Sequence, residues 1–330
     1  MPSSALPISN RRRGGSVTEL KNPSKSTHKS SSLAVIGTVA IDAVKTPFGS
    51  KDQVFGGSAS YFSYAASYFT SVAVVAVVGK DFPEEYRSVL QERNIDLSHL
   101  VQAEGKTFFW RGEYGSDLNV AHTLDTQLNV LQDFNPQLNF RTLPSFVFLA
   151  NIDPALQLSV LDQIHPVQPK FIACDTMNFW IANKKPELLK VLSRVDGVVL
   201  NDGEIRELTG ETNLINAARK VQDSGPSRVI LKKGEHGVLL FDESRFFALP
   251  AYPLEEVFDP TGAGDSFGGG MMGYLAECGD TSFENLKRAI AYGTMTASFA
   301  VEDFSLEGLR RSSREKIEER LEVFRKMCSL

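Results

Sequence analysis

The stretch from Asp259 to Gly270 holds the residues whose types and spacing best suit chemistry. It reads Asp-Pro-Thr-Gly-Ala-Gly-Asp-Ser-Phe-Gly-Gly-Gly and continues into an apolar helical pattern. Gly262 and Gly264 lack a Cβ, so the turn can take positive φ and let another group approach its backbone. Because unpaired N–H groups and the helix dipole favour an anion at a helix N-terminus, this turn suits a phosphate. Asp265 lies in the first helical turn, where a carboxylate could accept a proton from a hydroxyl group as a general base.

These residues also have a purely structural interpretation. Asp265 could only cap the helix and the glycines could only turn the chain, and for an isolated Gly-x-Gly-Asp that interpretation would be preferred. The run is longer, however, because Asp259 precedes Asp265 by six residues and three consecutive glycines lie inside the helix. The extended pattern therefore favours a catalytic turn.

The same run resembles the C-terminal signature of the ribokinase-like, or PfkB, family of carbohydrate and nucleoside kinases. The resemblance implies that Gly262, Ala263 and Gly264 form an anion hole for the transferred phosphoryl group, and that Asp265 takes the proton from the acceptor hydroxyl. It implies ATP and Mg²⁺ as cofactors and a small-molecule sugar or nucleoside as the partner. In phosphoryl transfer of this kind, positioning and charge neutralisation supply most of the catalysis.

Asp42 is a candidate acceptor-binding residue. The apolar run Leu33–Val39 predicts the first core strand, and Asp42 is expected just past its carboxyl end, where ligands of open α/β sheets gather. A lone Asp in such a place is more often a turn residue. The resemblance favours binding, because the family carries its acceptor-binding acid in a Gly-x-x-x-x-Asp pattern and Gly37 to Asp42 has that spacing.

Gly56 and Gly57 resemble the family's N-terminal Gly-Gly signature, in which the backbone comes close to the substrate. Many sugar kinases of the family have Asn four residues after the second glycine, and this chain has Tyr61 there. Tyr61 could pack on a sugar face or a nucleobase, or it could be a core residue.

Arg111 and Asn178 complete the predicted substrate contacts. Arg111 lies among alternating short strands between Lys106 and Thr126, which, with residues 43–55, resemble the small β lid that covers the acceptor in the family. Asn178 follows the apolar strand predicted at Phe171–Cys174, so it too is expected near the carboxyl edge of the sheet.

Asn201 and Glu204 lie three residues apart after another predicted strand. From spacing alone we favour a capping box, in which each side chain bonds the backbone of the other at a helix start. The family resemblance favours a different role, since its Asn-x-x-Glu motif orders Mg²⁺ and its waters around the phosphates. Mg²⁺ prefers few carboxylates and several waters, which fits Glu204 acting through water.

The nucleotide is expected beside the strand Arg228–Lys232 and the turn that follows it. Lys232, Gly234 and Gly237 resemble the family turn next to the nucleotide, and Thr261 of the catalytic run is assigned to the same side. The resemblance also implies that Asp259 and loop carbonyls in Val301–Gly308 hold a monovalent cation, K⁺. Alternatively, Asp259 only starts the turn before Pro260, a common use of Asp-Pro.

Strands alternating with helices from Leu33 onward predict an α/β fold, specifically a ribokinase-like three-layer αβα sandwich with a small β lid. One kinase domain is expected over residues 33–330, with lid segments at about 43–55 and 105–127. Residues 1–32 contain six Lys or Arg and one acid and are rich in Ser, which predicts a disordered basic tail. A transit peptide and a wrongly chosen start codon remain alternatives for this segment.

The composition narrows the remaining functional classes. Outside residues 1–32 there are 29 basic and 39 acidic residues, a balance that argues against a nucleic-acid surface. No apolar run approaches the ~20 residues that would span a bilayer. Three widely separated cysteines favour a reducing cytoplasm over a disulfide framework. A homodimer is among the expected assemblies, and a catalytically silent regulator on the same fold is the alternative to an enzyme.

Overall fold

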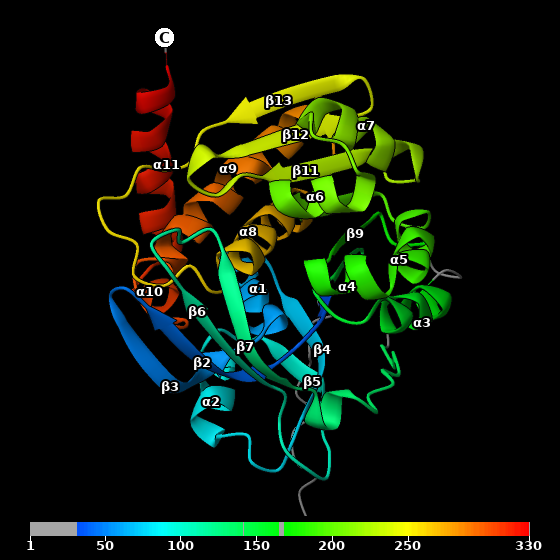
Figure 1. Cartoon of the computed structure of the whole chain (residues 1–330), viewed down its shortest axis with the longest axis vertical. Coiled ribbons are helices and arrows are strands. Elements are labelled where there is room, and N and C mark those ends of the chain that lie inside the picture. The colour runs from blue at the N-terminus through cyan, green and yellow to red at the C-terminus, as the bar shows by residue number, and fades with distance from the viewer. Residues whose placement is uncertain (1–31, 141, 165–167, 330) are drawn as a thin grey trace, which may run out of the picture.

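The computed structural model describes residues 32–140, 142–164 and 168–329. Apart from Ser32, the predicted basic tail lies outside these residues. The described chain forms three layers, in which helices cover both faces of one large sheet, and a smaller sheet lies at one end (Figure 1). The predicted α/β class and three-layer sandwich are therefore confirmed.

The large sheet has nine strands in the order β13-β12-β11-β10-β9-β8-β1-β4-β5. Neighbouring strands are parallel, except that β12 runs antiparallel to β11 and β13. The central strands are nearly continuous runs of buried Val, Ile and Leu, as expected when both faces are covered. Their bounds are β1 (Leu33–Ile36), β4 (Val72–Val78), β5 (Asp96–Gln102), β8 (Phe146–Leu149), β9 (Phe171–Asp175), β10 (Gly197–Asn201), β11 (Arg228–Lys232), β12 (Val238–Asp242) and β13 (Arg245–Leu249).

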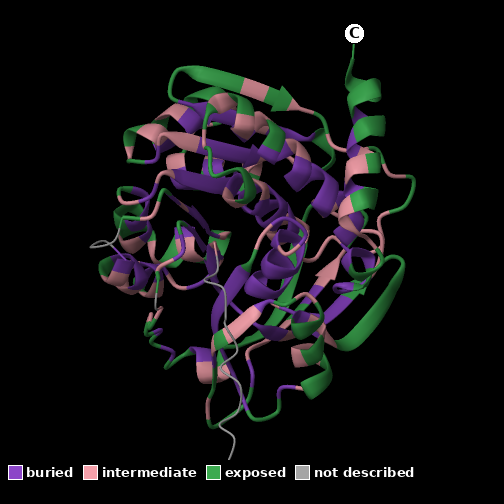
Figure 2. Ribbon diagram, turned by 180° about the vertical axis from the view of Figure 1, so that it is seen from behind, coloured by how far each residue is buried: buried purple, intermediate pink, exposed green. Residues whose placement is uncertain are grey.

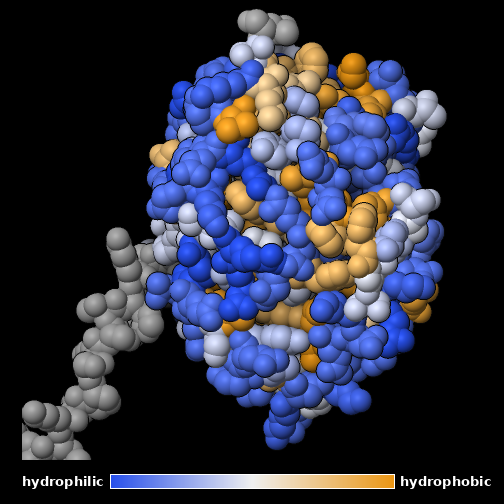
Figure 3. Space-filling view, turned by 90° about the vertical axis from the view of Figure 1, so that its left-hand side faces the viewer, coloured by the Kyte–Doolittle hydropathy of each residue, from blue (hydrophilic) through white to orange (hydrophobic). Residues whose placement is uncertain are grey.

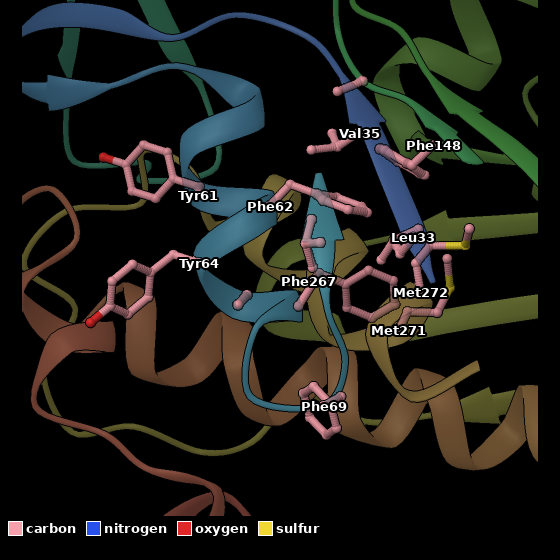
Figure 4. Packing of buried hydrophobic residues seen from close by; sticks show 14 of the residues in the cluster. Leu33, Val35, Tyr61, Phe62, Tyr64, Phe69, Phe148, Phe267, Met271 and Met272 are labelled. Carbon is pink, nitrogen blue, oxygen red and sulfur yellow. The ribbon is translucent and has the colours of Figure 1, made fainter. Parts of the chain in front are cut away.

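Two hydrophobic cores lie on the two faces of this sheet. In the first, Phe62 stacks on Phe148 with ring centroids 4.4 Å apart, and Phe267, Met271 and Met272 pack beside them (Figure 4). The helices of this face are α1 (Ser58–Ala66), α2 (Glu84–Glu92), α8 (Ala263–Cys278), α9 (Phe283–Ala300), α10 (Glu307–Arg310) and α11 (Arg314–Cys328). Those of the other face are α3 (Pro154–Ile164), α4 (Asn178–Asn183), α5 (Lys185–Leu192), α6 (Asp202–Thr209) and α7 (Leu214–Asp223).

Burial follows this layering. The central strands of the large sheet and helices α1 and α8 are mostly buried, whereas exposed residues gather on the edge strands, the outer helices and the small sheet (Figure 2). Hydrophilic side chains cover most of the face seen in Figure 3, where hydrophobic ones are exposed in smaller groups. No helix in the described ranges is both long and apolar enough to cross a membrane.

The small sheet has four strands in the order β3-β2-β6-β7. They are β2 (Ala40–Thr46), β3 (Gly49–Gly56), β6 (Phe109–Tyr114) and β7 (Ala121–Gln127). Strands β2 and β6 are parallel, and the two outer pairs are antiparallel hairpins. Every residue of β7 is exposed, so this sheet rests on the rest of the molecule mainly through β2 and β6.

Individual elements follow the sequence pattern closely, with two corrections. Strand β11 has the bounds predicted for it. Strand β5 was not predicted, because its polar sequence suits an edge strand and lacks an apolar run. Asp42 lies past the carboxyl end of β1, as predicted, but inside a further strand, β2, which pairs with both β3 and β6.

Candidate active site

The candidate site lies at the carboxyl ends of the parallel strands. From β1 the sheet extends through β4 to β5 on one side and through β8 to β11 on the other, and such a switch point leaves a crevice in open α/β sheets. Asp175, Asn201 and Lys232 are the last residues of β9, β10 and β11. The N-terminus of α8, with the predicted catalytic run, meets this edge.

Gly262 caps helix α8 and opens the predicted anion hole. Its φ of 75° is left-handed, and a Cβ at this position would overlap the ring of Tyr61, so only glycine fits. The Ala263 N–H donates to the Pro260 carbonyl (3.1 Å), and the Ser266 N–H donates to the Gly262 carbonyl (2.8 Å). Between them, the Gly264 N–H has no hydrogen-bond acceptor among the residues described, which leaves it free for an anion.

Asp265 occupies the first turn of α8 and is partly buried. Burial and the charge of Asp175 together raise the pKa of its carboxyl group to about 7, against the opposing effect of Lys232. A carboxyl group titrating near neutrality is suited to accept a proton from an alcohol in a general-base step.

Lys232 is the positive centre of a group that we call the lysine cluster: Asp175, Glu204, Lys232 and Asp265. Its Nζ lies 3.5 Å from Asp175 Oδ2, and it would lie 2.7 Å from a Cβ placed on Gly264. Burial alone would lower the pKa of Lys232, but the charges of Asp175, Glu204 and Asp265 raise it above its ordinary value. The ammonium group therefore stays charged, directly beside the anion hole.

Asn201 and Glu204 form the capping box expected from their spacing. The Glu204 N–H donates to Asn201 Oδ1 (2.8 Å), and the Asn201 N–H donates to Glu204 Oε2 (2.7 Å). Glu204 is nevertheless buried in the lysine cluster, where desolvation raises the pKa of its carboxyl group to about 7 against the pull of Lys232. Glu204 therefore caps α6 and still belongs to the candidate site with Lys232.

Asp42 belongs to a second group, the tyrosine cluster: Asp42, Asp259, Tyr61 and Tyr114. A Cβ on Gly56 would overlap the Asp42 carboxyl group, and the Gly57 N–H bonds that same group. Burial and the charge of Asp259 raise the pKa of Asp42 to about 8 despite this hydrogen bond. The two glycines thus let the carboxyl group lie flat against the backbone before α1.

Asp259 and Thr261 tie the catalytic run to the small sheet. Asp259 is fully buried, and its Oδ1 accepts from the Thr261 N–H (2.9 Å), while its Oδ2 accepts from the Ser305 N–H (3.4 Å). Thr261 Oγ1 in turn donates to the hydroxyl of Tyr114 on β6 (3.2 Å). Desolvation raises the pKa of Asp259 above its ordinary value.

The loop after β11 brings the predicted nucleotide side next to the small sheet. Gly234 (φ 55°) and Gly237 (φ 86°) bracket one 3₁₀ turn, Gly234–His236. A Cβ on Gly234 would overlap the side chain of Asn119, which lies in the turn between β6 and β7. The tip of that hairpin therefore reaches the predicted nucleotide loop.

Arg111 and Asn178 lie apart from both clusters. Arg111 is exposed, and its guanidinium group lies over the ring of Phe109, 5.8 Å from the centroid. Asn178 begins α4 at the surface, where its amide donates to Glu207 of α6. In this conformation neither side chain faces Asp265.

Three residues of the site escaped the sequence-based assignment. Asp175 ends a buried strand in the same way as Asn201 and Lys232, and that signal could have identified it. Tyr114 carried no comparable signal, because its contact with Thr261 joins residues 147 positions apart. Tyr61 was noticed only as a departure from a family pattern.

Comparison with known proteins agrees with this geometry. The family model for pfkB family carbohydrate kinases matches residues 30–308. A cytidine kinase of Thermococcus kodakarensis is 31% identical over 269 residues, covering 78% of this chain and 95% of that protein.

Solved structures show the same fold. A nucleoside kinase of Burkholderia thailandensis in complex with inosine has a TM-score of 0.74 at 16% identity, covering 88% of this chain and 98% of its own. A ribokinase of Arabidopsis thaliana complexed with ribose and ATP has a TM-score of 0.70 at 17% identity, covering 89% and 99%. The family match, together with these relatives, establishes that the chain is a phosphotransferase enzyme belonging to the pfkB family of carbohydrate kinases.

Proposed function

We propose that this enzyme transfers the γ-phosphoryl group of ATP to a primary alcohol of a sugar, with Asp265 as the general base. The observation that carries the proposal is the placement of Asp265: it lies in the first turn of α8, beside a free N–H and the Lys232 ammonium group, with a pKa near neutrality. A catalytically silent regulator would need neither this base nor this anion hole.

The reaction assigns one role to each side of the site. The acceptor oxygen forms a bond to the γ-phosphorus, the bond between that phosphorus and the ADP oxygen breaks, and the alcohol proton moves to a carboxylate oxygen of Asp265. Gly264 N–H and Lys232 face the phosphoryl group and stabilise its developing charge. Asp42, held by Gly56 and Gly57, accepts hydroxyl groups of the sugar.

The residues present suit Mg²⁺ and a nucleotide. Glu204, Asn201 and Asp175 provide the oxygen donors that Mg²⁺ prefers, and bound Mg²⁺ would neutralise phosphate charge. Gly234, Gly237 and Thr261 would border the nucleotide, and the small sheet would act as the lid of a single kinase domain over residues 33–330. A cytoplasmic location and a homodimer stay predictions.

A nucleoside is the second candidate acceptor. The 31% identity to a cytidine kinase over most of both chains supports it, since the phosphorylated group would again be a hydroxymethyl group on a ribose ring. Both candidates use the same base and the same anion hole, and they differ only in what occupies the space beyond the sugar.

ADP release on a panel of sugars and nucleosides tests the proposal. We expect Mg²⁺-dependent turnover with at least one sugar or nucleoside and its loss in Asp265→Asn. A wild-type enzyme that binds ATP and an acceptor, each detected by thermal stabilisation, but forms no ADP would contradict the proposal and favour the regulator.

A further inference from the structure

Tyr61 is a buried residue whose two ends have different surroundings. It lies in the first turn of α1, and its side chain is 1% exposed. Phe62, the next residue, points into the hydrophobic core, whereas the Tyr61 hydroxyl points away from that core (Figure 4). The Tyr61 ring supports the anion-hole turn, because a Cβ on Gly262 would overlap it.

The Tyr61 hydroxyl has no hydrogen-bond partner among the described residues. Leaving a buried hydroxyl unpaired is unfavourable, so folding alone does not account for it. A phenylalanine would fill the same space without that loss. The hydroxyl is therefore better explained by something that the folded protein binds.

The groups around this hydroxyl are those of the proposed acceptor site. Burial raises the pKa of Tyr61 well above its ordinary value, and the nearby charges of Asp259, Asp42 and Asp265 raise it further. Asp42 and Asp265 are the residues assigned above to the sugar hydroxyls and to the reacting alcohol. The Asp265 carboxylate, as the base, can only accept a hydrogen bond from the substrate, while a tyrosine hydroxyl can donate one.

We propose that Tyr61 is a substrate-binding residue that donates its hydroxyl hydrogen to an oxygen of the acceptor, between Asp42 and Asp265. This inference rests on the proposed function. The ring held under Gly262 fixes the hydroxyl relative to the anion hole, so the donor also positions the acceptor for transfer. The Tyr61 hydroxyl therefore favours substrates that place a hydrogen-bond-accepting oxygen, in addition to their hydroxyl groups, near Asp42 and Asp265.

Tyr61→Phe tests the inference, because it removes the hydroxyl and keeps the ring. The acceptor is the compound of the panel that the wild type phosphorylates fastest. We expect the KM for this acceptor to rise roughly five- to tenfold, as for loss of one hydrogen bond, with the KM for ATP unchanged. We also expect the melting temperature of the ligand-free protein to stay equal or rise, because an unpaired buried hydroxyl has been removed.

Tyr68→Phe is the matched control. Tyr68 is also buried near α1, but its hydroxyl donates to the Leu309 carbonyl (2.5 Å) and accepts from Ser312 Oγ (3.1 Å). Its removal should lower the melting temperature by ~2 °C and leave both KM values unchanged.

The outcomes separate the inference from the proposed function. An unchanged acceptor KM in Tyr61→Phe overturns the inference while the proposed function stands, and so does a lower melting temperature without a change in KM. Wild-type enzyme that phosphorylates nothing overturns the proposed function. In that case the inference is judged by binding: it survives only if stabilisation of the wild type by ribose or cytidine is lost in Tyr61→Phe.

Discussion

The lysine cluster and the tyrosine cluster meet at the N-terminus of α8, yet different neighbours shift the pKa values of their carboxyl groups. In the first, Lys232 opposes the rise in pKa of Asp175, Glu204 and Asp265. In the second, burial and the negative charges of Asp259 and Asp265 raise the pKa of Asp42 to about 8, and no cation among the described residues opposes the rise. The lysine cluster contains a cation, whereas the tyrosine cluster contains only carboxyl and tyrosine hydroxyl groups.

This difference matches the two proposed substrates. A nucleotide brings phosphates and a divalent cation, and the lysine cluster can exchange its internal ion pairs for contacts with them. A sugar brings only hydroxyl groups, and carboxyl and tyrosine hydroxyl groups can bond these without a net charge change. Asp265 belongs to the lysine cluster, and its charge also acts on Asp42 and Tyr61 of the tyrosine cluster. It therefore lies where proton transfer between the two substrates would need a base.

The largest expected effect comes from Asp265→Asn, which removes the proposed general base. Turnover should fall by ~10² to 10⁴, the usual contribution of a general base. The fold and the affinity for ATP should persist, because Asn keeps the shape and removes a buried charge. Steady-state rates and thermal stabilisation by ATP measure both, and retained turnover would refute the assignment.

The next largest effect is the loss of folding stability when Lys232 is removed from the lysine cluster. Lys232→Met leaves the carboxyl groups of the lysine cluster without their cation, and loss of one partner from a buried ion pair costs ~3 kcal/mol. The loss should be greater at pH 8 than at pH 5.5, since protonation of Asp265 and Glu204 relieves the repulsion. Urea denaturation at both pH values measures it.

Lys233→Met is the control for that experiment, because Lys233 is the adjacent residue and is not a member of the lysine cluster. It should lower the free energy of unfolding much less, and equally at the two pH values. Equal losses in both variants would show that Lys232 is not the cation on which the cluster depends.

The two clusters were also unequally predictable from sequence. Apolar strands lead to Lys232, Asn201 and Glu204, and glycines mark the turn before α8. The local sequence pattern was therefore enough to assign these residues and this turn to one edge of the sheet. The same reasoning gave the α/β class and the bounds of β11.

The tyrosine cluster depends on pairing between distant segments. Asp42 lies opposite Val54 on β3 and Trp110 on β6, and no local pattern reveals that arrangement. Tyr114 reaches Thr261 only because β6 lies against the catalytic run. Arg111, predicted as a lid contact because it lies among the short strands, is exposed over Phe109, since alternation along a strand cannot be assigned to a face before the pairing is known.

The carboxyl group of Asp42 in the tyrosine cluster should make the free energy of unfolding depend on pH. The carboxyl group of Asp42 ordinarily titrates near 3.8 and does so at about 8 in the folded chain. Between these values the unfolded chain is ionised while the folded chain keeps its proton. Stability of the ligand-free protein should therefore fall as pH rises from about 4 to 8, by up to ~1.4 kcal/mol per pH unit for each such group.

Asp42→Asn should flatten part of that fall, because it keeps the shape and removes the titrating group. Asp265 and Glu204, whose pKa values are also raised, account for the slope that persists. Asp52→Asn, an exposed change on β3, should leave the slope as it is. Denaturation at pH 5, 6.5 and 8 compares the three proteins, and parallel curves for Asp42→Asn and the wild type would contradict a buried, protonated Asp42.

A smaller effect distinguishes the two roles of Glu204. If Glu204 orders Mg²⁺ as well as capping α6, Glu204→Gln should raise the Mg²⁺ concentration for half-maximal rate several-fold. Gln can still accept the hydrogen bond from the Asn201 N–H, so the free energy of unfolding should change little. Lower stability with unchanged Mg²⁺ dependence would leave only the cap.

The smallest effect concerns K⁺ beside the tyrosine cluster, where we expect almost none. Both carboxylate oxygens of Asp259 already accept backbone N–H groups, from Thr261 and Ser305, which fits the turn interpretation of Asp-Pro. In the loop 301–308, Glu302 and Asp303 pair with arginines, whose charges disfavour a further cation. Exchanging K⁺ for tetramethylammonium at fixed ionic strength should therefore change the rate by less than about twofold, whereas a larger drop would mean that a cation orients the anion-hole N–H groups through Asp259.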